Sequence, residues 1–319
     1  MPEVMFKQVN YTVGHLMDQI RLGVLGLPDI QRPFVWPATK VRDLFDSMYK
    51  GFPVGYLLFW ENGADDGHRP IGVDAKQKVP RLLIVDGQQR LTSLYAVLNR
   101  VPVIREDYTP QRLQIAFYPK NETFAVSDAA IARDPEYIYD ISEVYAHGAL
   151  YSFIGRFVER LQQHRDVTPE EKERIAQAIN RLYSLRDYPL TALELPATID
   201  EEQVAEVFVR INSSGSALKQ ADFILTLMSV FWDDGRAELE DFCRKAKAQP
   251  SDDQPSPFNH YIKPNPDQLL RVSVALGFRR ARLEHVYSLL RGKDLQTKQF
   301  SIEQRERQFE VLREVQKYA

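Results

Sequence analysis

The sequence has little cysteine, no long hydrophobic run and no marked excess of charge of either sign. Its single cysteine, Cys243, excludes a disulfide framework and a cysteine-based metal cluster within the chain. No apolar stretch approaches the roughly 18 residues of a membrane-spanning helix, and the first residues lack the pattern of a secretory signal. We therefore expect a cytoplasmic protein that does not enter the membrane.

The net charge of −3 over 319 residues excludes a surface that is basic all over. Any contact with nucleic acid would therefore come from a local patch. Apolar residues make up 44% of the chain and charged residues 27%, which is typical of a globular protein and unlike a disordered one. The length suits one large domain or two ordinary ones.

The residue pattern predicts the α+β fold class, with strands and helices mixed at first and mostly helices later. Short apolar runs predict strands at 55–60, 81–85 and 188–195, and a strand pair across 112–128. Amphipathic spacing predicts one helix that starts at Thr39 and stops before Gly51, and another that starts at Thr168 with Pro169. Further helices are expected at 217–232, 267–278, 281–291 and 301–318.

These patterns also predict a division of the chain. We expect a mixed α/β core over residues 1–135, a helical part over 136–247 that completes it, a proline-rich linker over 248–268 and a helical extension over 269–319. The last predicted helix is still running at Ala319 without a capping signal, so we expect the chain to continue beyond it.

The sequence Asp-Gly-Gln-Gln-Arg at 86–90 lies where a predicted strand meets a predicted helix. The free backbone N–H groups and the dipole of such a helix start favour a phosphate group. Gly87 would allow close approach, Arg90 offers a two-pronged donor, and Asp86 would hold magnesium or orient Arg90. Gln88 and Gln89 add neutral donors. The structural alternative is that Asp86 caps the helix and Arg90 pairs with a surface acid.

Two other stretches suit the same chemistry. In the segment 30–37, Arg32 and Trp36 suit phosphate contact and base stacking, although Trp36 would equally anchor a loop on the core. In the segment 208–222, Arg210 and Asn212 end one predicted helix and Gly215 lies in the turn before the next. That arrangement favours a second anion site, or forms an ordinary corner between helices.

Taken together and in this order, the three stretches resemble the N-terminal domain of the GmrSD-type modification-dependent restriction enzymes. The resemblance rests on Ile30 to Trp36, Asp86 to Arg90, and Arg210 to Leu218 with Asp222. It implies a ParB/sulfiredoxin-like fold that binds a nucleoside triphosphate with Mg²⁺, often with hydrolysis. It also implies coupling of that activity to restriction of modified phage or foreign DNA.

The resemblance assigns residues to that activity. The catalytic group would be Asp86, Gln88, Gln89 and Arg90, with Asp86 as the metal ligand. The nucleotide ligands would be Arg32, Trp36, Gly87, Arg90, Arg210, Asn212 and Gly215. For hydrolysis, we expect positioning and charge neutralisation rather than a covalent intermediate, with Gln88 or Gln89 orienting the attacking water.

The basic segment 269–293 is the expected DNA contact, through Arg279, Arg280 and Arg282, unless it forms a solvated helical face. The six histidines include no compact His-Asn-His spacing, so we expect the nuclease domain in a missing portion or a partner subunit. Two alternatives stay open: a non-catalytic adaptor that binds DNA or a partner through a phosphate pocket, and a metal-dependent DNA endonuclease.

Overall fold

We describe a computed structural model of the chain. It describes residues 4–26, 34–61, 80–105, 109–146, 150–199, 201–212, 224–225, 228, 232–249, 256–279, 289–290, 292, 294, 297, 299 and 301–316. The chain forms two compact units. The sheet unit comprises Phe6–Phe59 and Leu82–Glu194, and the helical unit comprises Met1–Met5, Trp60–Arg81 and Leu195–Ala319. The domain boundaries expected at 135, 247 and 268 stay predictions.

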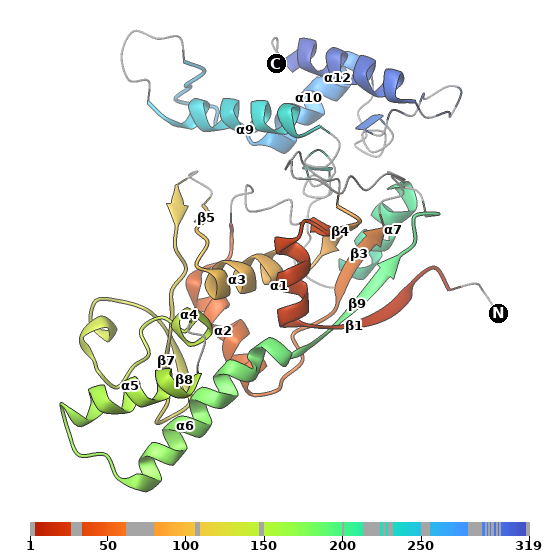
Figure 1. Cartoon of the computed structure of the whole chain (residues 1–319). Helices are drawn as coiled ribbons and strands as arrows, with labels where there is room; N and C mark the ends of the chain where they lie inside the picture. The colour runs from red at the N-terminus through yellow and green to blue at the C-terminus, as the bar shows by residue number, and fades with distance from the viewer. Residues whose placement is uncertain are drawn as a thin grey trace, which may run out of the picture. The chain divides into compact units, whose positions relative to one another are not determined.

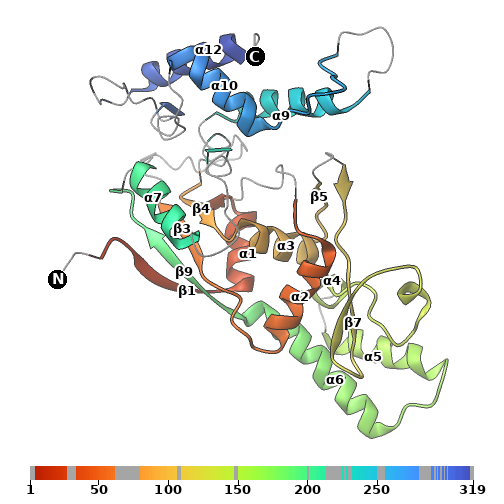
Figure 2. The ribbon, with the colours of Figure 1, turned by 180° about the vertical axis from the view of Figure 1, so that it is seen from behind.

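One five-stranded sheet organises the sheet unit, in the order β1-β9-β3-β4-β2 (Figures 1 and 2). The strands are β1 (Lys7–Thr12), β9 (Pro189–Leu195), β3 (Leu57–Glu61), β4 (Leu82–Asp86) and β2 (Leu25–Gly26). β1 pairs with β9 in antiparallel fashion, and β2 pairs with β4 in parallel fashion. The strands predicted at 55–60, 81–85 and 188–195 are confirmed. β1 and β2 were not predicted.

Helices and two small hairpin-like sheets complete the sheet unit. The helices are α1 (Val13–Arg21), α2 (Ala38–Tyr49), α3 (Gln88–Asn99), α4 (Ser142–Ala146), α5 (Leu150–Gln162) and α6 (Pro169–Tyr183). The small sheets pair β5 (Val103–Ile104) with β6 (Pro110–Gln111), and β7 (Ile115–Tyr118) with β8 (Thr123–Val126). The last pair confirms the strands expected across 112–128, and the class α+β is likewise confirmed.

The structure differs from one of the helix ends predicted for α2 and α6 and agrees with the others. The start of α2 at Thr39 is wrong, because the helix begins at Ala38 directly after Pro37. Pro37 is the N-cap in an extended conformation, and its side chain cannot accept a hydrogen bond, so the helix begins without a side-chain cap. The stop is confirmed: Gly51 follows the C-cap with φ of +76°. The start of α6 is confirmed, because Thr168 accepts a hydrogen bond from the backbone N–H of Glu171.

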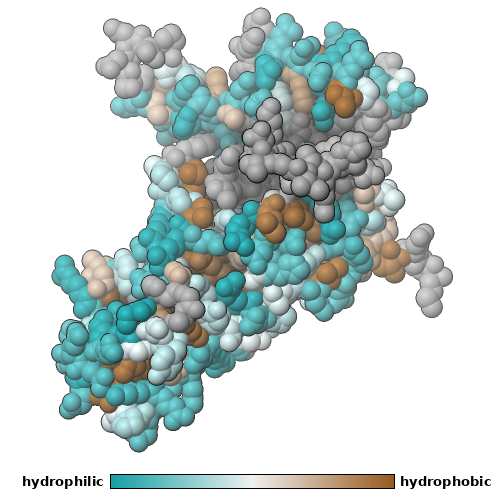
Figure 3. Space-filling view, in the orientation of Figure 1, coloured by the Kyte–Doolittle hydropathy of each residue, from teal (hydrophilic) through white to brown (hydrophobic). Residues whose placement is uncertain are grey.

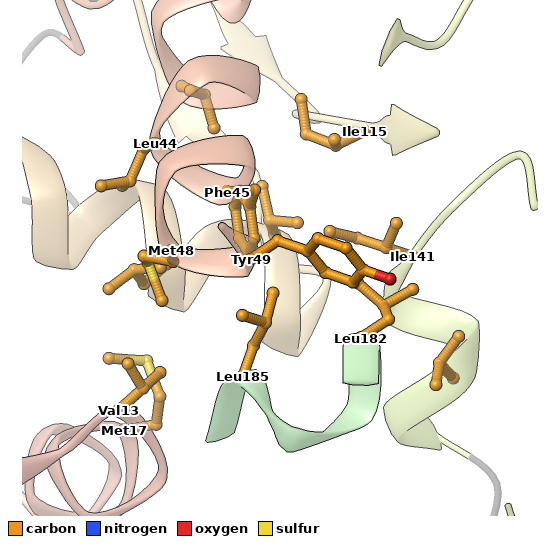
Figure 4. Close-up of a cluster of buried hydrophobic side chains, with 14 of the residues drawn as sticks. Val13, Met17, Leu44, Phe45, Met48, Tyr49, Ile115, Ile141, Leu182 and Leu185 are labelled. Carbon is orange, nitrogen blue, oxygen red and sulfur yellow. The ribbon is translucent and has the colours of Figure 1, made fainter. Parts of the chain in front are cut away.

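The hydrophobic core of the sheet unit packs against one face of α2. Figure 4 shows its side chains, with Tyr49 reaching from α2 toward Ile141 and Leu182. The Tyr49 ring lies 5.2 Å from the ring of Phe117, and its hydroxyl donates to the carbonyl oxygen of Ala178 at 3.3 Å. The buried face of α3 joins the same core through Leu91, Leu94 and Val97. This packing fixes the helix whose first turn carries the 86–90 sequence.

The helical unit contains α7 (Glu201–Asn212), α9 (Asp233–Lys247), α10 (Pro266–Phe278) and α12 (Ile302–Gln316). The helices expected at 267–278 and 301–318 are confirmed. α10 begins with a capping box between Asn265 and Gln268. Trp232, before α9, stacks on Phe309 of α12 at 4.8 Å, which joins the two helices. Most residues of the helices expected at 217–232 and 281–291 lie outside the described residues.

Two properties of the described surface concern the protein's surroundings. On the face in Figure 3, hydrophilic residues predominate and hydrophobic residues form small groups, in keeping with the small net charge and mixed composition. Over the described ranges, no helix has the length and apolar character needed to cross a bilayer.

The single thiol of the chain lies in α9. Cys243 has no exposed surface, and burial raises its pKa to about 12. Because the thiolate is the reactive form, we expect a thiol reagent at pH 8 to label native protein at least roughly a hundredfold more slowly than protein in guanidinium. Because the chain has one cysteine, the absorbance of the chromophore that the reagent releases reports the labelling of Cys243 alone. Rapid labelling of native protein would contradict the burial of Cys243.

Candidate functional site

The 86–90 turn connects the end of β4 to the first turn of α3. Gly87 is the N-cap of α3 with φ of +94°, and no side chain caps this helix in the described part of the chain. The alternative in which Asp86 caps the helix is therefore wrong. Leu91 donates its N–H to the Gly87 carbonyl at 3.0 Å, so the intrahelical ladder starts there. The preceding first-turn N–H groups lie ahead of that ladder, at the positive end of the helix dipole.

Gly87 is required at its position for two reasons. Its positive φ is a conformation that residues with a side chain rarely adopt. In addition, a β-carbon there would lie 2.3 Å from Cδ2 of the buried Leu57 of β3. The space beside Gly87 is thus occupied by Leu57 and by Arg90.

Arg90 fixes the segment that leads into β3. Its Nη1 donates to the carbonyl oxygen of Val54 at 2.7 Å, and its Nη2 donates to that of Tyr56 at 2.7 Å. Nη2 also contacts Oδ2 of Asp86 at 3.2 Å, which is the contact expected if Asp86 orients Arg90. The two side chains are only 16% and 18% exposed. Burial lowers the pKa of Arg90, and the Asp86 carboxylate opposes that shift.

Gln88 and Gln89 contact two further parts of the chain. The buried Gln88 donates from Nε2 to the carbonyl oxygen of Ile84 in β4 at 3.2 Å. Gln89 accepts the backbone N–H of Val35 on Oε1 at 3.2 Å. Three consecutive side chains therefore attach the first turn of α3 to three separate segments: β4, the segment 34–36 and the segment 54–56.

The segment 34–36 is held by the sheet unit and carries Trp36. Phe34 is buried and donates its N–H to the carbonyl oxygen of Ile104 at 2.5 Å. Arg105 donates from Nη1 to the carbonyl oxygens of Trp36 at 2.9 Å and Phe34 at 3.3 Å. The Trp36 ring packs partly on the core, and Lys40 Nζ lies 4.3 Å from its centroid. Trp36 thus anchors this loop, as one of the two interpretations expected.

Sequence reasoning missed Arg105 and the carbonyl groups of Val54 and Tyr56. One signal for the second group was present: Gly55 takes φ of +90°, and a β-carbon there would lie 2.7 Å from Nη1 of Arg90. Gly55 is the first residue of the strand predicted at 55–60, and a glycine within a strand pattern marks a close approach of this kind. No comparable local signal marks Arg105.

The other expected ligands lie elsewhere or outside the described residues. Arg210, in the last turn of α7, is exposed and pairs with Glu206 at 2.5 Å, and Asn212 is the last residue of that helix. Arg279 is exposed at the C-cap of α10, with φ of +52°. These three belong to the helical unit, whereas the 86–90 turn belongs to the sheet unit. Outside the described residues lie Arg32, Gly215, Arg280 and Arg282.

The donor set at the turn contains one carboxylate, Asp86. In the ranges that the structure describes, no group of three or more histidine, cysteine, aspartate or glutamate side chains is placed to hold a metal ion. A metal enclosed entirely by these side chains is therefore not indicated there. A Mg²⁺ ion that keeps its waters and binds chiefly to substrate phosphates needs only one or two carboxylates.

Comparison with known proteins places the chain in a family. The sequence profile of the "GmrSD restriction endonuclease, N-terminal domain" matches residues 13–229, a span that includes all three stretches singled out above. The chain is also 24% identical over 250 residues to "Uncharacterized protein MJ0686" of Methanocaldococcus jannaschii. That match covers 68% of this chain and 42% of the relative, so the chain spans less than half of the relative's length. The chain belongs to the family of GmrSD restriction endonuclease N-terminal domains.

Proposed function

We propose that the chain is the nucleotide-binding sensor module of a DNA restriction system, with its site at the first turn of α3. The observation that carries this proposal is the helix start at Gly87, which no side chain caps in the described residues and which adjoins the Asp86–Arg90 pair. Backbone N–H groups at such a start bind phosphate oxygens. The family match supports the connection to restriction.

Mg²⁺ fits this proposal as a partner of the nucleotide. Asp86 is 18% exposed and supplies the single carboxylate, and the phosphates and water would supply the remaining ligands. The ion would neutralise phosphate charge when bound. Arg90 already orients the same carboxylate, so the pair presents one negative and one positive group to the phosphate chain.

Hydrolysis of the nucleotide is the second part of the proposal. Gln89 is the better of the two amides for orienting water, because Gln88 is buried and bonded to β4. The Gln89 Oε1 accepts the N–H of Val35 and has a second lone pair, so it could accept a hydrogen bond from water while it keeps this contact.

The test is titration of the four nucleoside triphosphates with Mg²⁺, together with release of phosphate, for wild-type protein and Asp86→Asn. We expect saturable binding to wild type and an affinity at least about tenfold lower in the variant, because it loses the carboxylate but keeps the side-chain shape. Asp18→Asn is the matched control, since Asp18 of α1 also pairs with an arginine, Arg21, at 2.9 Å, and its side chain is 49% exposed.

We expect the control to bind like wild type. A folded wild-type protein that binds none of the four nucleotides would exclude the proposal. Binding without phosphate release, with or without modified DNA, would leave a nucleotide sensor and remove only hydrolysis.

A specific observation favours the second candidate, a non-catalytic adaptor. The side chains of Gln88, Gln89 and Arg90 all make hydrogen bonds within the sheet unit, as expected of a motif that holds segments together. The adaptor would bind DNA with a steep dependence on salt and without any effect of nucleotide. In that case Asp86→Asn would leave DNA affinity unchanged.

The proposed partner is DNA, of modified phage or foreign origin, cut by a nuclease domain or subunit beyond these residues. Arg279 is the described member of the expected DNA contact. Each lysine or arginine that contacts a phosphate adds about one to the slope of log affinity against log salt concentration. Replacing Arg279 would therefore lower the slope by about one if it makes such a contact.

A further inference from the structure

The segment 52–56 lies outside any strand and is held by side chains from distant parts of the sheet unit. Tyr188 donates its hydroxyl to the carbonyl oxygen of Phe52 at 2.6 Å. Arg90 donates to the carbonyl oxygens of Val54 and Tyr56, both at 2.7 Å. The carbonyl groups of residues 52, 54 and 56 therefore each accept a hydrogen bond from a distant side chain. These bonds hold the backbone of the segment up to the start of β3.

The end of this segment adjoins the candidate phosphate site. Nη2 of Arg90 contacts the Tyr56 carbonyl and the Asp86 carboxylate. A β-carbon on Gly87 would lie 3.3 Å from the same nitrogen. The Tyr56 carbonyl and Gly87 thus both lie close to one guanidinium group, which places the backbone of Tyr56 beside the first turn of α3.

Two aromatic residues are available next to this turn, and they differ in exposure. The Trp36 ring packs on the core and carries the Lys40 ammonium 4.3 Å from its centroid. Tyr56 is 63% exposed and lies outside that core cluster. An exposed ring on a fixed backbone offers an apolar face at a small cost in conformational entropy.

We propose that Tyr56 stacks on the base of the bound nucleotide and that Arg90 is the positioning residue that holds it there. This inference rests on the proposed function and names its ligand class: a nucleoside phosphate with an aromatic base, rather than inorganic phosphate or polyphosphate. Stacking on a ring is tolerant of base identity, because every base has a π face. The hydroxyl group of Tyr56 takes no part.

The test compares Mg²⁺ complexes of ATP, GTP, CTP and UTP with inorganic tripolyphosphate, which has the charge but no base. Affinities are measured by calorimetry for wild type, Tyr56→Ala and Tyr56→Phe. We expect Tyr56→Ala to lower the affinity for the nucleoside triphosphates by about tenfold and to leave the affinity for tripolyphosphate unchanged. Tyr56→Phe should bind like wild type. Tyr151→Ala is the control, because Tyr151 is 89% exposed on α5 of the same unit.

The outcomes separate this inference from the proposed function. Wild type that binds neither nucleotide nor tripolyphosphate overturns both. Nucleotide binding that Tyr56→Ala leaves intact overturns the stacking role alone. If Tyr56→Ala lowers the affinities for nucleotide and for tripolyphosphate equally, the stacking role is also overturned, because Tyr56 would then act on the phosphate site. If Tyr56→Phe lowered the nucleotide affinity as much as Tyr56→Ala, the contribution of Tyr56 would come from its hydroxyl group, and the stacking role would likewise be overturned.

Discussion

Replacing Gly87 with alanine is expected to lower the free energy of unfolding by about 3 kcal/mol, because two unfavourable terms coincide. The backbone has φ of +94°, which costs a residue with a β-carbon about 1–2 kcal/mol. The added methyl group would also lie 2.3 Å from Cδ2 of Leu57, which is 1% exposed and has little room to move. Denaturant unfolding followed by circular dichroism measures the loss.

Gly23→Ala separates the cost of the backbone conformation from the cost of the contact with Leu57. Gly23 has a similar φ of +69°, but a β-carbon there would meet nothing within 4 Å. We therefore expect this control to lose only about 1 kcal/mol, the cost of the backbone conformation. Equal losses at the two glycines would show that the contact with Leu57 relaxes at no cost. A double variant with Leu57→Ala should lose less than the sum of its single changes.

The second large effect is expected at Asp140, whose removal should lower the free energy of unfolding by about 3 kcal/mol. Asp140 is 3% exposed, and its Oδ1 accepts the N–H of Ser142 at 3.0 Å and its hydroxyl at 2.5 Å. Its Oδ2 accepts Nη2 of Arg112 at 2.5 Å. Asp140→Ala leaves the buried donors of Ser142 without this acceptor. Thermal and denaturant unfolding provide the measurement.

Two variants distinguish a buried network from an ordinary ion pair. Asp140→Asn keeps the shape and one acceptor oxygen, so we expect a smaller loss than for alanine. Glu122→Gln removes an exposed carboxylate that pairs with Arg181 at 3.2 Å, and should cost less than about 1 kcal/mol. If Asp140→Ala were no more harmful than Glu122→Gln, the network would contribute little to stability.

The elements predicted from sequence are those with strong local signals. The run Leu82–Val85 is apolar at every position, and its four residues are buried in β4. β1 was missed because Lys7–Thr12 contains one aliphatic residue, and as the edge strand it is largely exposed. The place of β9 between β1 and β3 was not predictable, because no local pattern specifies which distant strands become neighbours.

The candidate site shows the same limit. Asp86 at the end of β4 and Arg90 in the first turn of α3 are only four residues apart, so their contact was among the roles expected from the sequence. The carbonyl groups that Arg90 binds belong to residues 36 and 34 positions away. The N–H that Gln89 binds is 54 positions away. Residue chemistry alone identified the turn as a candidate phosphate site, whereas its hydrogen bonds to distant segments depend on the tertiary fold.

The strand order of the sheet has a consequence for biosynthesis. β1 is made first and is paired with β9, one of the last parts of the sheet unit to be made. At about 5–20 residues per second on the ribosome, β1 remains without its partner for roughly 10–35 s. β3, on the other side of β9, also has one edge uncovered until then. The nascent chain therefore exposes two strand edges to chaperones and to other nascent chains until residues 189–195 emerge from the exit tunnel.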